Sequence, residues 1–164
     1  MASGKSTVLK ELAKRFEINA IDLDDYIADK EGGTIVNIFK NKGEIYFRKQ
    51  ENKYLAELLK SSNDFVLALG GGTPCYANNM ELITRLSTSI YLKANLKTLF
   101  NRLQNEKDSR PLITDLTDEK LQEYIAKHLF ERGVFYEQAL YQISIDNKSI
   151  DDIIEDIHRL LLKL

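Results

Sequence analysis

Cysteine, histidine and long apolar runs are scarce in this chain of 164 residues, and each scarcity excludes a class of protein. The one cysteine, Cys75, excludes an internal disulfide framework. With His128 and His158 as the two histidines, the sequence holds no His/Cys cluster for a metal. No apolar run approaches the ~20 residues that span a bilayer, and the N-terminus has no signal-peptide core. We therefore expect a cytoplasmic protein without a membrane partner.

The charge balance is close to neutral, with a formal net charge of −2. No strong basic field is present to attract nucleic acid, so we expect no nucleic-acid partner. Hydrophobic residues make up 43% of the chain and charged residues 29%, as in ordinary globular proteins. A chain of this length holds one sizeable core, so we expect a single domain over residues 1–164.

Short apolar runs alternate with amphipathic helical patterns along the whole chain. The predicted strands are 18–23, 65–69, 89–92 and 141–145. The predicted helices are 4–16, 26–29, 34–39, 44–59, 78–86, 96–103, 118–139 and 150–164. The run FVLAL at 65–69 indicates a strand buried on both faces. This alternation predicts an α/β fold with a parallel sheet.

The first stretch with chemical meaning is Gly4-Lys5-Ser6-Thr7, at the start of a predicted helix. Backbone N–H groups at a helix N-terminus bind phosphate oxygens. Lys5 can reach the β- and γ-phosphates of a nucleotide, and the Ser6 hydroxyl can bind Mg²⁺. The alternative is a chance Gly-Lys-Ser sequence at a helix start.

Two further stretches follow predicted strands, at the edge where open α/β sheets bind ligands. Asp22 and Asp24 are expected on one side of the chain, with Leu23 turned away; one carboxylate can support a metal and the other can accept a hydroxyl proton. The alternative is an acidic helix cap. The triplet Gly70–Gly72 indicates that some group approaches the backbone closely, although a plain turn is the alternative.

Four separate arginines could serve an anionic substrate. They are Arg48, Arg102, Arg110 and Arg132. Taken singly, each fits a solvated surface charge. A small anion would need guanidinium groups from more than one element. Residues 105–117 are polar and are predicted to form a loop, and Arg110 in this loop could close over a transferring phosphoryl group.

Together these motifs resemble those of the shikimate kinase family. The resemblance covers residue 1 to about 147. It rests on GKST (4–7), IDLDDYI (21–27), FRKQE (47–51), LGGGTP (69–74), RPL (110–112) and ERGVFYEQA (131–139). GKST alone is shared by many kinases and ATPases, whereas the whole set in this order is far more specific.

The resemblance implies a three-layer α/β/α fold of the nucleoside-monophosphate-kinase type, with parallel strands in the order 2-3-1-4-5. It implies that the γ-phosphoryl group of ATP is transferred, with Mg²⁺ as cofactor, to the 3-hydroxyl of shikimate, in aromatic amino-acid biosynthesis. It places a substrate-binding helical segment at about 26–60 and a lid loop at about 105–117. The protein is expected to act as a monomer on two small molecules, ATP and shikimate.

The resemblance also implies roles for individual residues. The implied catalytic residues are Lys5, Asp24 and Arg110. The implied ATP contacts are Ser3, Gly4, Lys5, Ser6, Thr7, Arg102, Arg110 and Asn147. The implied shikimate contacts are Asp24, Arg48, Gly70, Gly71, Gly72 and Arg132, with both arginines on the carboxylate. Ser6 and Asp22 are the implied Mg²⁺ ligands. Glu51 matches a glutamate that steadies Arg48, and Phe39 and Phe47 match apolar walls of the substrate site.

In the family, a buried strand and a first glycine precede the phosphate-binding loop. The recorded sequence begins after both, so strand 1 is absent from it, and we expect these residues upstream of Met1. Strand 1 is the middle strand of the order 2-3-1-4-5. Residues 65–69 and 89–92 are therefore not expected to pair directly with each other.

Two other functions stay open from the residues. The first is a different small-molecule P-loop kinase, of the gluconate or nucleoside type, which would have less use for both Arg48 and Arg132. The second is a catalytically silent domain that binds anions without turnover.

Overall fold

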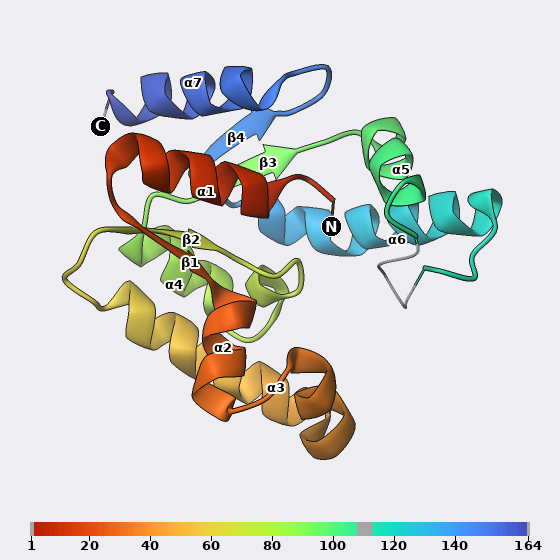
Figure 1. The fold of residues 1–164 in the computed structure, drawn as a ribbon, viewed down its shortest axis with the longest axis horizontal. Helices are drawn as coiled ribbons and strands as arrows, with labels where there is room; N and C mark the ends of the chain where they lie inside the picture. Colours follow the sequence, from red (N-terminus) through yellow and green to blue (C-terminus); the bar gives the residue numbers. More distant parts are fainter. Residues whose placement is uncertain (1, 108–112, 164) are drawn as a thin grey trace. The chain divides into compact units, whose positions relative to one another are not determined.

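The computed structural model describes residues 2–107 and 113–163, and Figure 1 shows their path. The elements are α1 (Lys5–Phe16), β1 (Asn19–Asp22), α2 (Leu23–Glu31), α3 (Ile35–Leu59), β2 (Phe65–Ala68), η1 (Thr73–Cys75), α4 (Asn79–Leu86), β3 (Ile90–Lys93), α5 (Leu96–Gln104), α6 (Asp118–Tyr136), β4 (Tyr141–Ser144) and α7 (Ile150–Leu161). They fall into two compact units. Unit 1 comprises Met1–Gly4 with Ile90–Leu164, and unit 2 comprises Lys5–Ser89. The expectation of a single domain stays a prediction.

Unit 2 contains a two-stranded parallel sheet in which β1 pairs with β2, with Asn19 opposite Phe65 and Asp22 opposite Ala68. Helix α1 packs on both strands. Its apolar stripe explains why: Val8, Leu9, Leu12 and Ala13 are buried, as the helical spacing predicts. Strand β1 ends at Asp22, and α2 begins at the next residue, Leu23.

Unit 1 contains a second parallel pair, β3 with β4, in which Ile90 lies opposite Tyr141. Helix α7 packs against β4, and α5 packs against α6. Ile153, Ile154 and Ile157 of α7 are buried, so the last apolar stripe is also a core face, as predicted. Ser149 and Asp152 form a capping box at the start of this helix.

The two strand pairs agree with the expected α/β fold. In the described part of the chain, β2 pairs with β1 and β3 pairs with β4, and β2 does not pair with β3. In the order 2-3-1-4-5 that the resemblance implies, β1 and β2 correspond to strands 2 and 3, and β3 and β4 correspond to strands 4 and 5. The expected burial of FVLAL is wrong for four positions, because Phe65, Val66, Leu67 and Leu69 are half-buried and Ala68 alone is buried. Within the described residues β2 has one strand partner, so its other edge is less covered.

The expected alternation of Asp22 and Asp24 along a strand is also wrong. The strand ends at Asp22, and α2 begins at Leu23, three residues earlier than expected. The Asp22 carboxylate caps this helix by accepting a hydrogen bond from the Asp24 backbone N–H at 3.1 Å. The acidic-cap alternative therefore holds for Asp22, and Asp24 lies in the first turn of a helix.

Helix α3 is bent at Gly43, where φ is +82° and ψ is 169°. The sequence predicts two separate helices here, and the kink at Gly43 divides α3 between them. Thr34 caps the first half by accepting a hydrogen bond from the Asn37 N–H at 3.2 Å. Because the chain turns at Gly43, both halves of α3 can contribute residues to one site.

Helix α6 ends at Tyr136, earlier than the expected end near residue 139.

In the described ranges, no helix has both the length and the apolar character needed to cross a membrane.

Candidate functional site

Unit 2 contains a cleft of about 170 Å³ at the end of its sheet. It is lined by Asp24, Ile35, Phe39, Phe47, Arg48, Glu51, Gly70, Gly71 and Gly72. Three structural parts supply these residues: the start of α2, the two halves of α3, and the glycine loop after β2. The cleft therefore gathers all the predicted substrate residues of unit 2 in one place.

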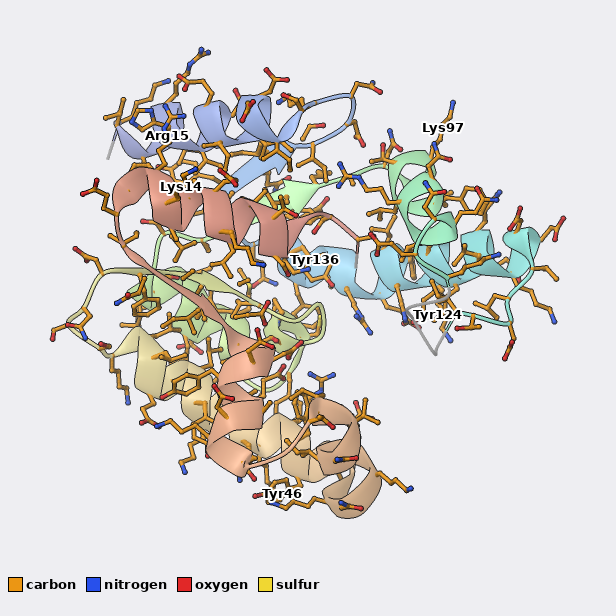
Figure 2. All side chains as sticks on the ribbon, viewed as in Figure 1. Lys14, Arg15, Tyr46, Lys97, Tyr124 and Tyr136 are labelled. Atoms are coloured by element: carbon orange, nitrogen blue, oxygen red, sulfur yellow. The ribbon has the colours of Figure 1, made fainter. Side chains whose placement is uncertain are left out.

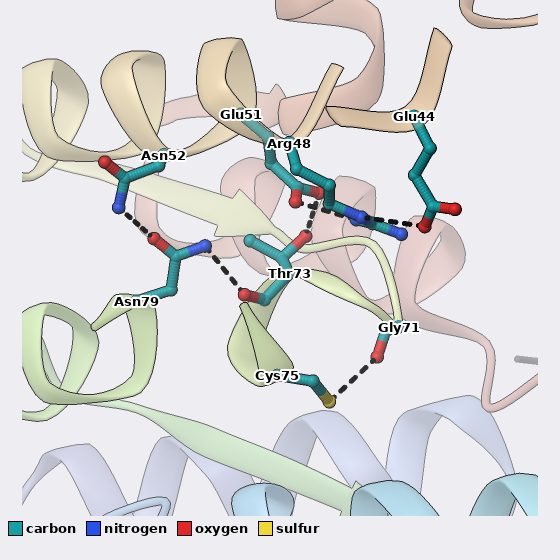
Figure 3. Close-up of polar contacts among 8 residues, drawn as sticks. All are labelled: Glu44, Arg48, Glu51, Asn52, Gly71, Thr73, Cys75 and Asn79. Atoms are coloured by element: carbon teal, nitrogen blue, oxygen red, sulfur yellow. Dashed lines mark hydrogen bonds and ion pairs between the residues drawn. The ribbon is translucent and has the colours of Figure 1, made fainter. Parts of the chain in front are cut away.

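Arg48 is held from several sides. Its Nη1 donates to Glu51 Oε2 at 2.7 Å, and its Nε lies 3.6 Å from Glu44 Oε1 (Figure 3). Its guanidinium also lies over the Phe47 ring, 5.2 Å from the ring centroid. Its side chain is 19% exposed, so a planar, partly buried donor group is presented at the cleft.

Glu51 is a buried charged residue, at 1% exposure. One carboxylate oxygen accepts from Arg48 and the other accepts from the Thr73 hydroxyl at 2.6 Å. The carbonyl of Thr73 in turn accepts from Asn79 Nδ2 at 2.8 Å, and Asn79 Oδ1 accepts from Asn52 Nδ2 at 2.6 Å (Figure 3). A buried carboxylate needs partners on both oxygens, and Glu51 has them.

Asp24 is half-buried and borders the same cleft. Burial raises the pKa of its carboxyl, and the negative charges of Asp22 and Glu51 raise it further. The positive charges of Lys5 and Arg48 act in the opposite direction, but the sum is still a raised pKa. A carboxylate with a raised pKa accepts a proton more readily, which suits a general base.

The glycine loop is glycine-rich because side chains approach its backbone. A Cβ at Gly72 would lie 2.6 Å from Nη2 of Arg48, closer than real Cβ contacts come. A Cβ at Gly70 would lie 3.2 Å from Thr73 Oγ1 and 3.4 Å from Asp24 Oδ1. Close approach was predicted, and the approaching groups identified here are side chains of the protein itself.

The predicted phosphate-binding residues lie at the start of α1. Gly4 has φ of +84°, a left-handed conformation that favours glycine, and α1 begins at Lys5. The first turn of α1 contains Lys5, Ser6 and Thr7 and no acidic residue. Its backbone N–H groups can therefore receive an anion at the helix N-terminus.

The remaining predicted ATP contacts lie in unit 1. Arg102 of α5 donates to the Ala2 carbonyl at 3.2 Å, and a Cβ on Gly4 would lie 3.5 Å from its Nη1. The guanidinium is thus next to the segment that contains Ser3. Asn147, between β4 and α7, has φ of +57°. Arg110 lies outside the described residues, and so does the middle of the predicted lid.

Arg132 lies on α6 of unit 1, one turn after His128. Burial and the charge of Arg132 lower the pKa of His128. The Nδ1 atom of His128 is buried and lies 3.8 Å from Glu131 Oε2, and among described residues it has no hydrogen-bond partner. Arg132 and Arg48 belong to different units, and their joint action on a carboxylate stays a prediction.

Three residues around the site were not identified from the sequence. Thr73 binds Glu51, which is 22 positions away, and Asn79 binds the Thr73 carbonyl; no local pattern connects Glu51 with either residue. Ile35 lines the cleft, and its spacing of four residues from Phe39 was a usable helical signal.

A second hollow of about 180 Å³ in unit 2 is lined by Glu31, Gly32, Gly33, Asn37, Ile38, Asn41 and Lys42. It contains none of the predicted substrate residues, so we assign the substrate to the cleft at Arg48. Across the described ranges, no group of three or more His, Cys, Asp or Glu is placed to hold a metal ion by itself.

Comparisons with known proteins show which family the chain resembles. The family model described as shikimate kinase matches residues 1–162. The shikimate kinase of Flavobacterium johnsoniae is 46% identical over 158 residues, which is 96% of this chain and 92% of that protein. That of Flavobacterium psychrophilum is 43% identical and covers 98% of this chain and 94% of that protein.

Two solved structures are also similar. The crystal structure of shikimate kinase from Bacteroides thetaiotaomicron matches with a TM-score of 0.88 and 32% identity, over 98% of this chain and 93% of that one. Shikimate kinase from Acinetobacter baumannii, solved in complex with shikimate, matches with a TM-score of 0.86 and 32% identity, over 99% and 89% of the two chains.

Proposed function

The chain belongs to the shikimate kinase family, and on that premise we propose that the cleft at Arg48 binds shikimate while the start of α1 binds the phosphates of ATP. The protein is an ATP-dependent kinase that acts on a hydroxyl group of shikimate, and we propose the 3-hydroxyl as that group. The observation that carries the residue assignment is the placement of Arg48, Glu51 and Asp24 around one cleft in unit 2.

The charges of this cleft require a second arginine for the substrate carboxylate. Arg48 contributes one positive charge, and Asp24 and Glu51 are two carboxylates, so the charges that line the cleft favour no anion by themselves. We assign the second guanidinium to Arg132. Asp24 and the backbone of Gly70, Gly71 and Gly72 contact the substrate ring and its hydroxyls.

On the ATP side, the backbone of Ser3 and Gly4 and the first turn of α1, at Lys5, Ser6 and Thr7, bind the phosphates. Arg102 and Asn147 border the adenine. Arg110 neutralises charge on the transferring phosphoryl group, in the lid at about 105–117. This segment and the helical segment at about 26–60 are proposed as parts of one kinase domain.

The donor set suits Mg²⁺, which takes oxygen ligands, keeps several waters and binds to phosphates. The Ser6 hydroxyl and the Asp22 carboxylate, which has one oxygen engaged at the helix cap, would hold it. When bound, Mg²⁺ neutralises charge on the phosphates. We also propose that the protein acts as a monomer in the cytoplasm, on small molecules.

In the proposed reaction, the shikimate oxygen forms a bond to the γ-phosphorus of ATP, and the bond from that phosphorus to the β,γ-bridging oxygen breaks. Asp24 accepts the hydroxyl proton, for which its raised pKa suits it. ADP leaves with the electron pair of the broken bond. Lys5 and Arg110 stabilise the charge on the oxygens of the transferring group.

The test is a coupled ADP-release assay on the full chain with shikimate, gluconate and nucleosides as acceptors. We expect turnover with shikimate and loss of shikimate affinity in Arg48→Ala and Arg132→Ala, with Arg85→Ala as a matched control on the exposed side of α4. Unchanged affinity in both variants would refute the carboxylate assignment. ATP binding without turnover would favour the silent anion-binding domain.

A further inference from the structure

A buried chain of polar side chains extends from the substrate cleft into the interior of unit 2. It runs from Arg48 to Glu51, then to Thr73, Asn79 and Asn52, through hydrogen bonds of 2.6–2.8 Å (Figure 3). The link from Thr73 to Asn79 passes through the Thr73 backbone carbonyl, and the two ends of the chain, Arg48 and Asn52, are half-buried. Thr73 and Asn79 are 0% exposed, and Glu51 is 1% exposed. Three elements are joined in this way: α3, η1 and α4.

Thr73 has a particular place in this chain because its hydroxyl binds the Glu51 oxygen that Arg48 does not use. Without that hydroxyl, Glu51 Oε1 would lose the hydrogen bond described for it in a buried position, and such an unmet requirement is costly. The carboxylate would then turn or move toward another donor. Arg48 would move with it, because the two are joined at 2.7 Å.

The same threonine also fixes the glycine loop. It follows Gly72 directly, its N–H donates to the Gly70 carbonyl at 3.1 Å, and its Oγ1 lies 3.2 Å from the Cβ position of Gly70. The Arg48 guanidinium lies against Gly72. One residue is therefore tied through its backbone N–H to the loop that borders the cleft, and through its side-chain hydroxyl to the carboxylate that orients the arginine.

Asn79 anchors the arrangement from behind. Its amide donates to the Thr73 carbonyl, and its own oxygen accepts from Asn52 of α3, the helix that also carries Arg48 and Glu51. The circuit closes on α3. Rotation of η1 relative to α3 would break several hydrogen bonds together, so the loop and the arginine keep one relative position.

We propose that Thr73 is a positioning residue for shikimate: its hydroxyl holds the Glu51 carboxylate, and through it the Arg48 guanidinium, in the orientation that receives the substrate carboxylate. Thr73 does not touch the substrate in this proposal. The inference rests on the proposed function of the cleft, because it specifies how Arg48 is oriented there.

The test compares Thr73→Val, which keeps the shape and removes the hydroxyl, with Thr73→Ser, which keeps the hydroxyl. We expect Thr73→Val to raise KM for shikimate about tenfold, the scale of one hydrogen bond to a charged group, with KM for ATP unchanged. Thr73→Ser should stay within about threefold of the parent, since it loses one methyl group. Thr84→Val is the matched control, because the Thr84 hydroxyl binds the Met80 carbonyl outside the site.

The outcomes distinguish a failure of the proposed function from a failure of the role proposed for Thr73. If the parent protein does not phosphorylate shikimate, the proposed function fails. If the parent is active and Thr73→Val lowers the thermal midpoint but leaves KM for shikimate within twofold, Thr73 is structural and this inference is refuted. Should Thr73→Val not fold, Thr73→Ala is measured in its place, and a shikimate KM within twofold of the parent refutes the inference equally.

Discussion

The Arg48 guanidinium lies so close to Gly72 that a Cβ at Gly72 would be 2.6 Å from Nη2 and 3.0 Å from Nη1 and the guanidinium carbon. The backbone conformation at Gly72 is ordinary, with φ of −88° and ψ of −18°. Glycine is therefore needed there for space. The glycine loop and the substrate arginine form one packed unit.

We expect Gly72→Ala to raise KM for shikimate about tenfold or more, because the added methyl displaces Arg48 and overpacking costs about 1–3 kcal/mol. Steady-state kinetics with shikimate and ATP varied separately would measure this. Gly33→Ala is the control, since a Cβ at Gly33 meets nothing within 4 Å. Equal shikimate KM values for Gly72→Ala and the parent would contradict the packing explanation.

Replacing Arg48 by lysine should weaken shikimate binding although the charge is kept. A lysine offers one ammonium group, which cannot both hold Glu51 and present a planar donor pair to the substrate. We expect the shikimate dissociation constant to rise about tenfold to a hundredfold, measured by calorimetry. Arg85→Lys on exposed α4 is the control. Full affinity in Arg48→Lys would show that charge alone suffices.

Asp24→Asn should abolish most turnover and yet stabilise the folded protein at neutral pH. The pKa of Asp24 is raised in the folded state, so its contribution to stability is present below the unfolded pKa and is lost as pH rises through the folded pKa. The neutral amide of asparagine avoids the free-energy cost of an ionised carboxylate at this half-buried position. We expect a fall of about 10²–10⁴-fold in kcat, together with a higher thermal midpoint at pH 7.

The control for this prediction is the exposed neighbour Asp25, as Asp25→Asn, which should change neither quantity by much. A melting curve for Asp24→Asn that shows lower stability than the parent at pH 7 would contradict the argument from burial and like charges.

Arg102→Met should raise KM for ATP while leaving KM for shikimate unchanged. Arg102 donates to the Ala2 carbonyl next to the predicted phosphate-binding residues, and its loss frees that segment. We expect an increase of about fivefold, the scale of one modest hydrogen bond. Lys97→Met is a matched loss of charge on the same helix, at an exposed position labelled in Figure 2, and should have little effect. A shift in shikimate KM alone would overturn the assignment.

Glu31 should contribute stability that is lost in acid. Its carboxylate accepts hydrogen bonds from Tyr46, Lys42 and Tyr54, and these lower its pKa from 4.5 to about 2. Tyr46 is labelled in Figure 2. A lowered folded pKa gives stability that is present above the unfolded pKa and lost as pH falls toward the folded one.

We therefore expect Glu31→Gln to lower the free energy of unfolding by about 2 kcal/mol at pH 7, in proportion to hydrogen bonds made to a charged group. The difference from the parent should shrink between about pH 4.5 and 2. Urea unfolding over that pH range is the measurement, with exposed Glu57→Gln as control. A difference that does not vary with pH would exclude the ionised carboxylate as its source.

The alternating pattern was sufficient to place the strands and most helices, because apolar periodicity reports burial directly. It failed where a side chain accepts a hydrogen bond from the backbone of a nearby residue. Asp22 caps α2 and so ends the strand that was expected to run to residue 23. The FVLAL run was read as fully buried, but its burial depends on strand partners that local sequence does not specify.

For the site, single motifs located Arg48, Asp24 and the glycine loop, but the contacts that hold them are between distant residues. Thr73 and Glu51 are 22 positions apart, and nothing local pairs them. A signal for Glu51 did exist: it falls on the stripe of buried positions that includes Phe47, Leu55 and Leu58. A charged residue on an apolar stripe predicts a buried partner.

The bend in α3 at Gly43 brings residues from both sides of one helix to the cleft: Ile35 and Phe39 precede it, and Phe47 and Arg48 follow it. A Cβ at Gly43 would meet nothing within 4 Å, so glycine is needed there for its φ of +82° alone. The φ angle of Gly43 thus sets the distance between the two parts of α3 that line the substrate cleft. A substitution at Gly43 would therefore change how Ile35 and Phe39 face Phe47 and Arg48 across the cleft, although it would remove none of the side chains that line it.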